Sequence, residues 1–452
     1  MTHRRQPNLE WASSPRRAVL KMAGPIAVSM VSHAVIALVD TLCVSSLGAS
    51  ALAGVGLASV SFFTFAGFGF GFARGAKTLV AQAFGAGDAL EVRLHAGASL
   101  VAGVALGVVV SVLVYAASYA LPVLAASGGA GREALNYGRV IAFAGFPAMV
   151  YVSQREVRYG IGDSTSPMRA ALLANAVNIG LDVLLVLHLD WGVAGAAWAS
   201  VAAFTVQMLA LFPRRDSMAL PRARHLRELV AIGSPTGVQF VLEIGTFAVL
   251  AAILSTLPER EMAAHQVALQ FMHFVFLPMV ALGEACSSLA GQAWGADRLS
   301  LVHRVSRIAL RFSLWHGAVW FVALGLGRYF IAGFFAEEGE LLDAIAALLL
   351  LGGLFQVFDG LGITAAAILR GIGDVRYAAV VGVAAAWIFT PPLAYFLGVR
   401  MGYGAVGGWV GFCLQIAVQA ALLHRRLWRQ VGGFRLLPEV PRRNLGVKRP
   451  AA

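Results

Sequence analysis

Charged residues are scarce in this chain of 452 residues: they make up 13% of it, whereas globular proteins carry about 25%. Hydrophobic residues make up 59%, and the mean hydropathy is +0.75. So little charge beside so much apolar sequence excludes a soluble enzyme, a disordered scaffold and a collagen-like fibre. The composition indicates a protein that is surrounded by lipid.

Cysteine is also scarce. Cys43, Cys286 and Cys413 lie far apart within apolar stretches, so their spacing predicts neither a disulfide framework nor a cysteine metal site. The chain contains no His-Glu-x-x-His sequence and no Asp-rich diphosphate motif. We therefore expect no enzyme activity, no resident metal and no cofactor.

Long apolar runs are what the chain has instead. A helix needs about twenty mostly apolar residues to cross a bilayer, whereas barrel strands are about ten alternating residues. Twelve segments meet the helical requirement: 20–45, 52–73, 94–122, 139–160, 168–188, 192–212, 229–256, 262–286, 306–334, 342–370, 376–398 and 404–424. The sequence thus predicts an all-α integral membrane protein with twelve transmembrane helices.

The positive charges predict the orientation, because cytoplasmic loops hold most Lys and Arg. The N-terminal segment, the even-numbered loops and the tail hold all of the 35 basic residues except five: Arg132, Arg139, Arg260, Arg328 and Arg400. Both termini are therefore expected in the cytoplasm and the chain in the inner cell membrane. The net charge of +12 then reflects orientation, and no nucleic-acid partner is expected.

The chain also repeats itself at an offset of about 210 residues. Gln82-Ala83-Phe84-Gly85-Ala86 matches Gln292-Ala293-Trp294-Gly295-Ala296, and Gly160-Ile161-Gly162-Asp163 matches Gly371-Ile372-Gly373-Asp374. Six spans in each half, in the same orientation, imply parallel repeats with a central cleft between them. That arrangement is typical of a substrate carrier.

The repeat divides the chain into two lobes and three polar segments. The predicted parts are a cytoplasmic N-terminal segment 1–19, an N-lobe 20–212, a cytoplasmic linker 213–228, a C-lobe 229–424 and a basic cytoplasmic tail 425–452.

Four acids lie well inside predicted spans, where a charge costs about 2.5–3.5 kcal/mol and is a functional hypothesis by default. They are Asp40, Asp182, Glu243 and Asp359. Helical spacing places polar residues on one face of each of five spans: Ser29, Ser32, His33 and Asp40; Asn175, Asn178 and Asp182; Thr236, Gln239, Glu243 and Thr246; Gln266, Gln270 and His273; Gln356 and Asp359. These five polar faces are compatible with lipid around the protein only if they face a shared, partly hydrated interior.

Two interpretations of these groups remain open. The Asn and Gln side chains can form hydrogen bonds between helices, or they can line a substrate cleft. No lysine lies in the deep part of a predicted span, so the acids lack a partner there and attract protons or small cations. His33 is either a neutral buried histidine or a proton relay. Arg158 is either a headgroup-level arginine or a gate partner for a carboxylate.

Several motifs together resemble one known family, the multidrug and toxic compound extrusion (MATE) transporters. The likeness runs from residue 20 to about 424 and rests on these features: Pro25 spaced from Val39-Asp40-Thr41, the loop Val80-Ala81-Gln82-Ala83-Phe84-Gly85-Ala86-Gly87-Asp88, Ala263-Ala264-His265-Gln266, Gly291-Gln292, and Leu369-Arg370-Gly371-Ile372-Gly373-Asp374.

This resemblance implies a V-shaped, two-lobed fold and export of organic cations driven by Na⁺ or H⁺ entry. Asp40 matches the family's first-span acid, and Glu243 and Asp359 match the C-lobe acids of the NorM-type branch. Asn178-Ile179-Gly180-Leu181-Asp182 is similar to the N-lobe pair of the DinF-type branch, where the ion is usually taken to be H⁺. Because the chain carries both sets, H⁺ and Na⁺ both stay open.

We therefore expect secondary active efflux of lipophilic cations by alternating access, with membrane lipids around a monomer. The expected cation-coupling residues are Asp40, Asn178, Asp182, Glu243 and Asp359; the expected cleft residues are His33, Asn175, Gln239, Gln266, Gln270, His273 and Gln356, and Arg158 is the gate candidate.

Other functions fit less well. A flippase for a lipid-linked or natural-product precursor is the alternative within the wider superfamily, but those proteins tend to have a cationic cavity, whereas the deep residues here are acidic. A channel or receptor would not show saturable flux that follows an imposed ion gradient.

Overall fold

The computed structural model describes residues 9–213, 217–337 and 339–432, and in these ranges it contains helices and turns but no strand. The helices of the first half are η1 (Glu10–Ser13), α1 (Pro15–Ser45), α2 (Ala49–Gly85), α3 (Ala89–Ser118), α4 (Leu121–Leu124), α5 (Gly128–Ile141), η2 (Ala142–Ala144), α6 (Gly145–Gly160), α7 (Thr165–Asp182), η3 (Val183–His188) and α8 (Gly192–Ala210). Those of the second half are α9 (Ala223–Leu254), α10 (Glu259–Gly295), α11 (Leu299–Ala332), α12 (Glu340–Gly371), α13 (Val375–Leu393), η5 (Ala394–Arg400) and α14 (Gly404–Gln430).

Eleven of the described helices are long and apolar enough to cross a membrane by themselves. The remaining predicted span, 139–160, is a crossing made of α5 and α6, which the short 3₁₀ turn η2 separates. Pro147 follows this turn and has no N–H to donate to the preceding turn of helix, which explains why the crossing is broken here. The predicted all-α fold with two six-helix halves is confirmed.

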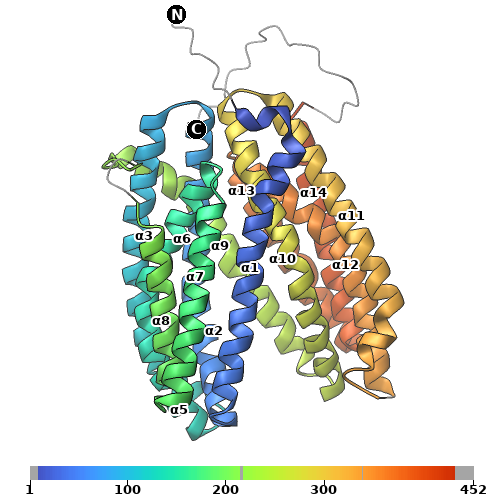
Figure 1. Ribbon diagram of the computed structural model, residues 1–452. Helices are drawn as coiled ribbons and strands as arrows, with labels where there is room; N and C mark the ends of the chain where they lie inside the picture. The colour runs from blue at the N-terminus through green and yellow to red at the C-terminus, as the bar shows by residue number, and fades with distance from the viewer. Residues whose placement is uncertain (1–8, 214–216, 338, 433–452) are drawn as a thin grey trace, which may run out of the picture.

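The two halves form separate groups of helices, with α2, α3 and α5–α8 on one side and α10–α14 on the other (Figure 1). Helix α1 begins and helix α14 ends at the same end of the molecule, which we call the terminal end. The helices of the two groups diverge toward the opposite end. An even number of crossings explains why the two terminal helices share one end.

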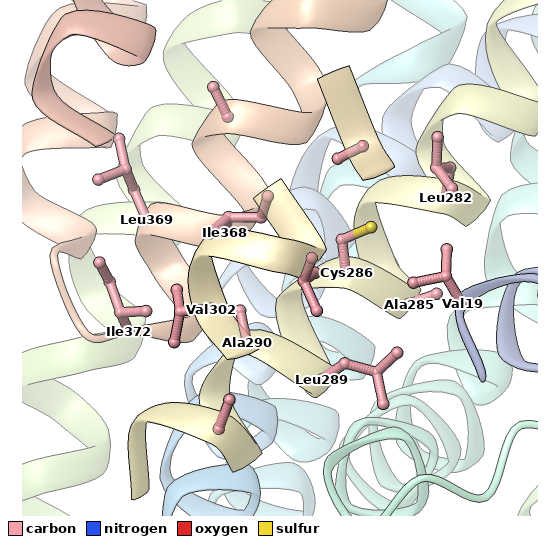
Figure 2. Close-up of a cluster of buried hydrophobic side chains, with 14 of the residues drawn as sticks. Val19, Leu282, Ala285, Cys286, Leu289, Ala290, Val302, Ile368, Leu369 and Ile372 are labelled. Carbon is pink, nitrogen blue, oxygen red and sulfur yellow. The ribbon is translucent and has the colours of Figure 1, made fainter. Parts of the chain in front are cut away.

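The halves contact each other near the terminal end. Val19 and Ile26 of α1 are fully buried in one apolar cluster with residues of α10, including Ala285 and Leu289, and Figure 2 shows this cluster. Helices α2 and α9 cross at Gly75 and Gly233, where a Cβ on Gly75 would lie 2.8 Å from the backbone of Gly233. Only glycine allows the two backbones to approach this closely.

Several helices extend beyond the predicted spans. Helix α2 ends at Gly85 and α10 at Gly295, whereas the predictions ended at 73 and 286. Helix α9 begins at Ala223 inside the predicted linker, and α14 continues to Gln430 inside the predicted tail. Hydropathy marks where a helix leaves lipid, but backbone hydrogen bonding continues wherever protein contacts or water allow it. Residues 1–8, 214–216 and 433–452 of the predicted polar segments lie outside the described residues.

A short π-helix follows α7 and another follows α13. They are η3 (Val183–His188) and η5 (Ala394–Arg400), which occupy equivalent positions in the two repeats. π-Helical segments often occur at functional sites because they shift side chains relative to the regular helix. Asp182 is the last residue before η3.

Candidate functional site

Two carboxyl groups meet in the first half of the protein. Asp40 on α1 and Asp182 at the end of α7 lie close enough for their carboxyl groups to interact directly. Asp182 is fully buried, and neither its oxygens nor Oδ1 of Asp40 has a hydrogen-bond donor among the described residues. Two carboxylates this close cannot both be charged at low cost, so the pair requires a proton or a cation between its members.

Other polar groups lie near this acid pair. Asn178 and Asn175 are on α7, one turn and two turns before Asp182. Asn178 is 1% exposed, and its Nδ2 has no partner among the described groups; the same holds for Oδ1 of the buried Asn175. Tyr137 of α5 is buried within electrostatic range of both carboxyls, next to the hydroxyl groups of Ser59 and Ser200. Asp40 and Asp182 therefore lie together, with Tyr137 beside them and Asn178 one turn away on α7.

His33 is about two turns before Asp40 on α1, yet its environment is different. The ring is half-buried and lies within electrostatic range of Arg155 on α6. A nearby guanidinium group disfavours a charged imidazole. This contact agrees better with a neutral histidine than with a proton relay.

The second half contains another pair of acids. Oε1 of Glu243 accepts a hydrogen bond of 2.8 Å from Nε2 of Gln239, one turn earlier on α9. Asp359 on α12 is 5% exposed, its Oδ2 has no donor among the described groups, and it lies within electrostatic range of Glu243. Gln356 is fully buried beside it and donates to Sδ of Met272 at 3.4 Å.

The remaining predicted cleft residues do not join this acid pair in a buried cluster. Gln266, Gln270 and His273 form an exposed stripe along one face of α10. The sequence predicted that these three residues share one helix face. Because their side chains are exposed, they do not form buried hydrogen bonds between helices.

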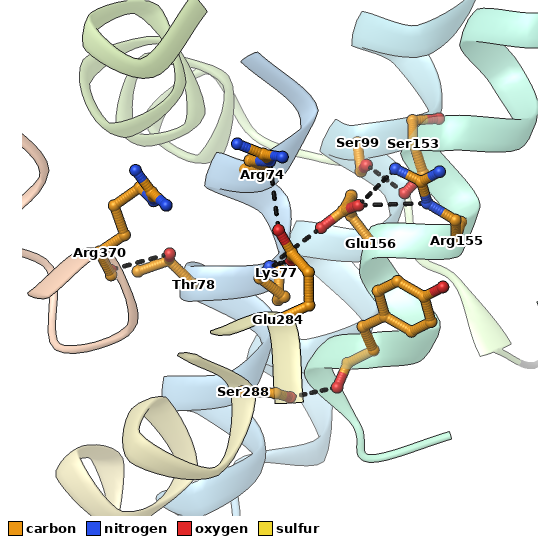
Figure 3. A network of polar contacts seen from close by, with 11 residues as sticks. Arg74, Lys77, Thr78, Ser99, Ser153, Arg155, Glu156, Glu284, Ser288 and Arg370 are labelled. Atoms are coloured by element: carbon orange, nitrogen blue, oxygen red, sulfur yellow. Dashed lines mark hydrogen bonds and ion pairs between the residues drawn. The ribbon is translucent and has the colours of Figure 1, made fainter. Parts of the chain in front are cut away.

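A network of buried charges joins the halves near the terminal end (Figure 3). Nζ of Lys77 on α2 is paired with Oε2 of Glu284 on α10, and it lies 3.4 Å from Oε2 of Glu156 on α6. Arg74 approaches Glu284 at 3.4 Å, and Arg155 approaches Glu156 at 2.9 Å. Lys77 and Glu156 are 3% and 1% exposed, so the network is nearly dry and its charges interact strongly.

Uncharged contacts repeat on both sides of the same interface. The Thr78 hydroxyl donates to the carbonyl of Arg370 at 3.0 Å, and the hydroxyl of Ser288, its repeat equivalent, donates to the carbonyl of Tyr159. Gln82 donates to the Gly371 carbonyl at 3.0 Å, and Gln292 donates to the Gly160 carbonyl at 2.9 Å. Each half therefore donates two hydrogen bonds to the other half, from side chains at equivalent positions of the two repeats.

Arg158, the predicted gate residue, pairs within its own half. Its guanidinium group lies 3.8 Å from Asp163, and it lines a hollow of about 440 Å³ beside α3 and α6. The described ion pairs that cross between the halves use other residues: Lys77 and Arg74 pair with Glu284. Glu91 on α3 also pairs with Arg224 on α9, at 2.7 Å.

Lys77, Glu156 and Tyr137 were not among the residues predicted from the sequence. Lys77 falls outside the predicted span 52–73. Glu156 lies in the predicted span 139–160, where the prediction concerned Arg158. A usable signal existed for the charge network, because the repeat offset of 210 places Arg74 opposite Glu284, two charges of opposite sign. Near the terminal end four cations meet two acids, whereas the acids predicted inside the spans were Asp40, Asp182, Glu243 and Asp359.

Two repeated helical halves that are joined at one end, each with acids inside its membrane-spanning helices, are typical of a membrane transporter. The MatE family profile matches this chain twice, over residues 25–184 and 235–396. The chain belongs to the MatE family and is a MATE transporter.

Relatives and solved structures agree with this assignment. The chain is 30% identical to a "Probable multidrug resistance protein NorM" of Deinococcus radiodurans, with 92% of this chain and 96% of the relative covered. It is 28% identical to a protein of the same name in Rhizobium meliloti, with 91% and 93% covered. A structure described as the "outward-facing conformation of a multidrug resistance MATE family transporter" superposes with a TM-score of 0.84 at 23% identity, over 92% of this chain and 96% of that one.

Proposed function

We propose that this transporter exports lipophilic organic cations across the inner membrane, by antiport with H⁺ or Na⁺. The observation that carries the proposal is the pair Asp40 and Asp182, two buried carboxyls without a donor from the described residues. Such a pair binds a proton or a small cation and releases it when its surroundings change. The names of the curated relatives support drug efflux as the use of this binding energy.

The coupling requires that ion and substrate favour opposite states. Binding of the ion to Asp40 and Asp182 neutralises the first half, and α1, which also packs against α10, transmits the change to the second half. Glu243 and Asp359 then attract the cationic group of the substrate. Because the halves are held together at the terminal end, the described state is the outward-facing one if the termini are cytoplasmic.

Uptake of a fluorescent lipophilic cation by everted vesicles tests the proposal, with a proton gradient and a Na⁺ gradient imposed separately. We expect one gradient to drive uptake in the wild type and the Asp40→Asn protein to lose it. Normal accumulation by the Asp40→Asn protein would refute the coupling role of the pair.

The cationic network gives the flippase alternative one supporting observation, since Lys77, Arg74, Arg155 and Arg370 gather between the halves. Absence of uptake under either gradient, together with gradient-independent movement of an anionic lipid probe, would favour that alternative.

A further inference from the structure

The segment that precedes α1 reaches the contact between the halves. Leu9 is 6% exposed and belongs to the apolar cluster that α1 forms with α10. The 3₁₀ turn η1 (Glu10–Ser13) follows Leu9, and α1 begins at Pro15. From this turn the Trp11 side chain contacts Gln292, near the end of α10. A residue outside every predicted span therefore lies at the point where the halves are held together.

The side-chain amide of Gln292 is bound at both of its atoms. Nε1 of Trp11 donates to Oε1 of Gln292 at 2.8 Å, and Nε2 of Gln292 donates to the carbonyl of Gly160 at 2.9 Å. An indole N–H is only a donor and a backbone carbonyl is only an acceptor, so both bonds form in a single orientation of the amide. If the amide turned over, N–H would face N–H and oxygen would face oxygen.

Gln292 depends on this donor because its side chain is shielded from water. The residue is 1% exposed, and a buried amide oxygen without a donor is costly. Trp11 removes that cost only in the orientation in which Nε2 faces Gly160 of the other half. The indole N–H therefore favours the contact that closes the terminal end.

Gln82, the equivalent residue of the first repeat, has no such support. Its Nε2 donates to the carbonyl of Gly371 at 3.0 Å, but across the described ranges its Oε1 accepts no hydrogen bond from the protein. Gln82 is half-buried, so water can bind this oxygen. The two equivalent contacts therefore differ, and the Gln292 contact is the one that depends on the segment before α1.

We propose that Trp11 is a positioning residue for closure of the terminal end: its indole N–H holds the Gln292 amide toward Gly160 and so favours the closed state. The inference goes beyond the proposed function and rests on one part of it, the opening of the terminal end during the cycle. The predicted cytoplasmic N-terminal segment 1–19 then helps to set the equilibrium between the two states.

Cysteine labelling of the purified protein in nanodiscs tests the inference, with no substrate or ion gradient present. The reporter is Ala81→Cys in a background without the three native cysteines. Ala81 is fully buried, and a Cβ on Gly291 of the other half would lie 2.9 Å from its Cβ, so labelling requires the terminal end to open. Trp11→Phe keeps an aromatic ring and removes the N–H. We expect it to raise the labelling rate roughly 2- to 12-fold, the range for one net hydrogen bond.

The two glutamines provide matched backgrounds for this variant. Gln292→Leu removes the acceptor of the Trp11 N–H, so Trp11→Phe should cause no further rise there. Gln82→Leu leaves that acceptor in place, so Trp11→Phe should keep its full effect. Trp315→Phe on α11 is the control, because it removes an indole that is 65% exposed, and it should leave the rate unchanged in each background.

An unchanged labelling rate in Trp11→Phe would overturn the inference, whatever the thermal stability of the variant. An equal rise in the wild-type and Gln292→Leu backgrounds would also overturn it, because Trp11 would then act by packing alone. Either result leaves the proposed function intact, since gradient-driven uptake decides that separately. Absence of labelling in every variant, the double glutamine variant included, would contradict both the inference and the proposed alternating access.

Discussion

Gln82 and Gln292 hold the two halves together in the same way from opposite sides. Nε2 of Gln82 donates to the carbonyl of Gly371 at 3.0 Å, and Nε2 of Gln292 donates to the carbonyl of Gly160 at 2.9 Å. The two donors occupy equivalent positions in the two repeats, and so do the two acceptors. The contact between the halves is therefore approximately two-fold symmetric. In the proposed alternating-access cycle this contact breaks and re-forms once in each turnover, so its strength would help to set the equilibrium between the two states.

Replacing either glutamine by leucine should shift the protein toward the state that is open at the terminal end. Each net hydrogen bond contributes about 0.5–1.5 kcal/mol, or roughly a 2- to 12-fold change in population. Ala81→Cys, in a background without the three native cysteines, reports the opening because Ala81 is fully buried and a Cβ on Gly291 of the other half would lie 2.9 Å from its Cβ. The labelling rate should rise in each single variant and rise further in the double one. Gln207→Leu, a buried glutamine of α8, is the control; equal labelling in all variants would contradict the role of the pair.

Gly85 and Gly295 limit how closely the halves can approach. A Cβ on Gly85 would lie 1.9 Å from the carbonyl oxygen of Gln292, and one on Gly295 would lie 2.0 Å from that of Gln82. Gly85→Ala or Gly295→Ala should therefore prevent closure and abolish gradient-driven transport in a protein that is still inserted and folded. Gly56→Ala on α2 meets nothing within 4 Å and should transport normally. Transport by either interface variant at the wild-type rate would show that the contact is dispensable.

Lys77 and Glu284 form a buried ion pair, so removal of one partner should cost more than removal of both. Breaking a buried pair typically costs about 3–5 kcal/mol, because a charge is left without compensation. Thermal unfolding in detergent should show a large loss of stability in Lys77→Met and in Glu284→Gln. The double variant should lose less than the sum, with a coupling energy of about 0.5–3 kcal/mol. Additive losses would mean that Glu156 alone compensates Lys77.

The predicted spans and the repeat gave most of the fold, because both depend on local properties of the sequence. Hydropathy identified each crossing, and the offset of 210 paired Gln82 with Gln292 before their contacts were visible. Helix ends were less predictable, since α2 continues through Arg74 and Lys77 by packing against the other half. A window of hydropathy does not contain that information.

The candidate sites were predictable where the relevant residues share a helix face. Asn175, Asn178 and Asp182 follow helical spacing, and so do Gln239 and Glu243. The grouping of Arg74, Arg155 and Arg370 was not predictable in the same way, because these residues come from three helices and from both halves. The partner of Arg158 was not predictable either. Whether Arg158 pairs with Asp163 or with a carboxylate of the other half depends on the path of the loop between α6 and α7.

Asp40 and Asp182 should behave as one functional unit. In the proposed function the two carboxyls bind the coupling ion between them, so loss of either charge should abolish gradient-driven accumulation as completely as loss of both. We expect Asp40→Asn, Asp182→Asn and the double variant to show the same residual uptake in everted vesicles. Asp343→Asn, an exposed acid in the first turn of α12, should retain wild-type uptake. A different outcome would contradict a shared ion site. In that outcome each single variant keeps part of the uptake, and the fold-loss in the double variant equals the product of the two single fold-losses, as expected for carboxyls that act at separate steps.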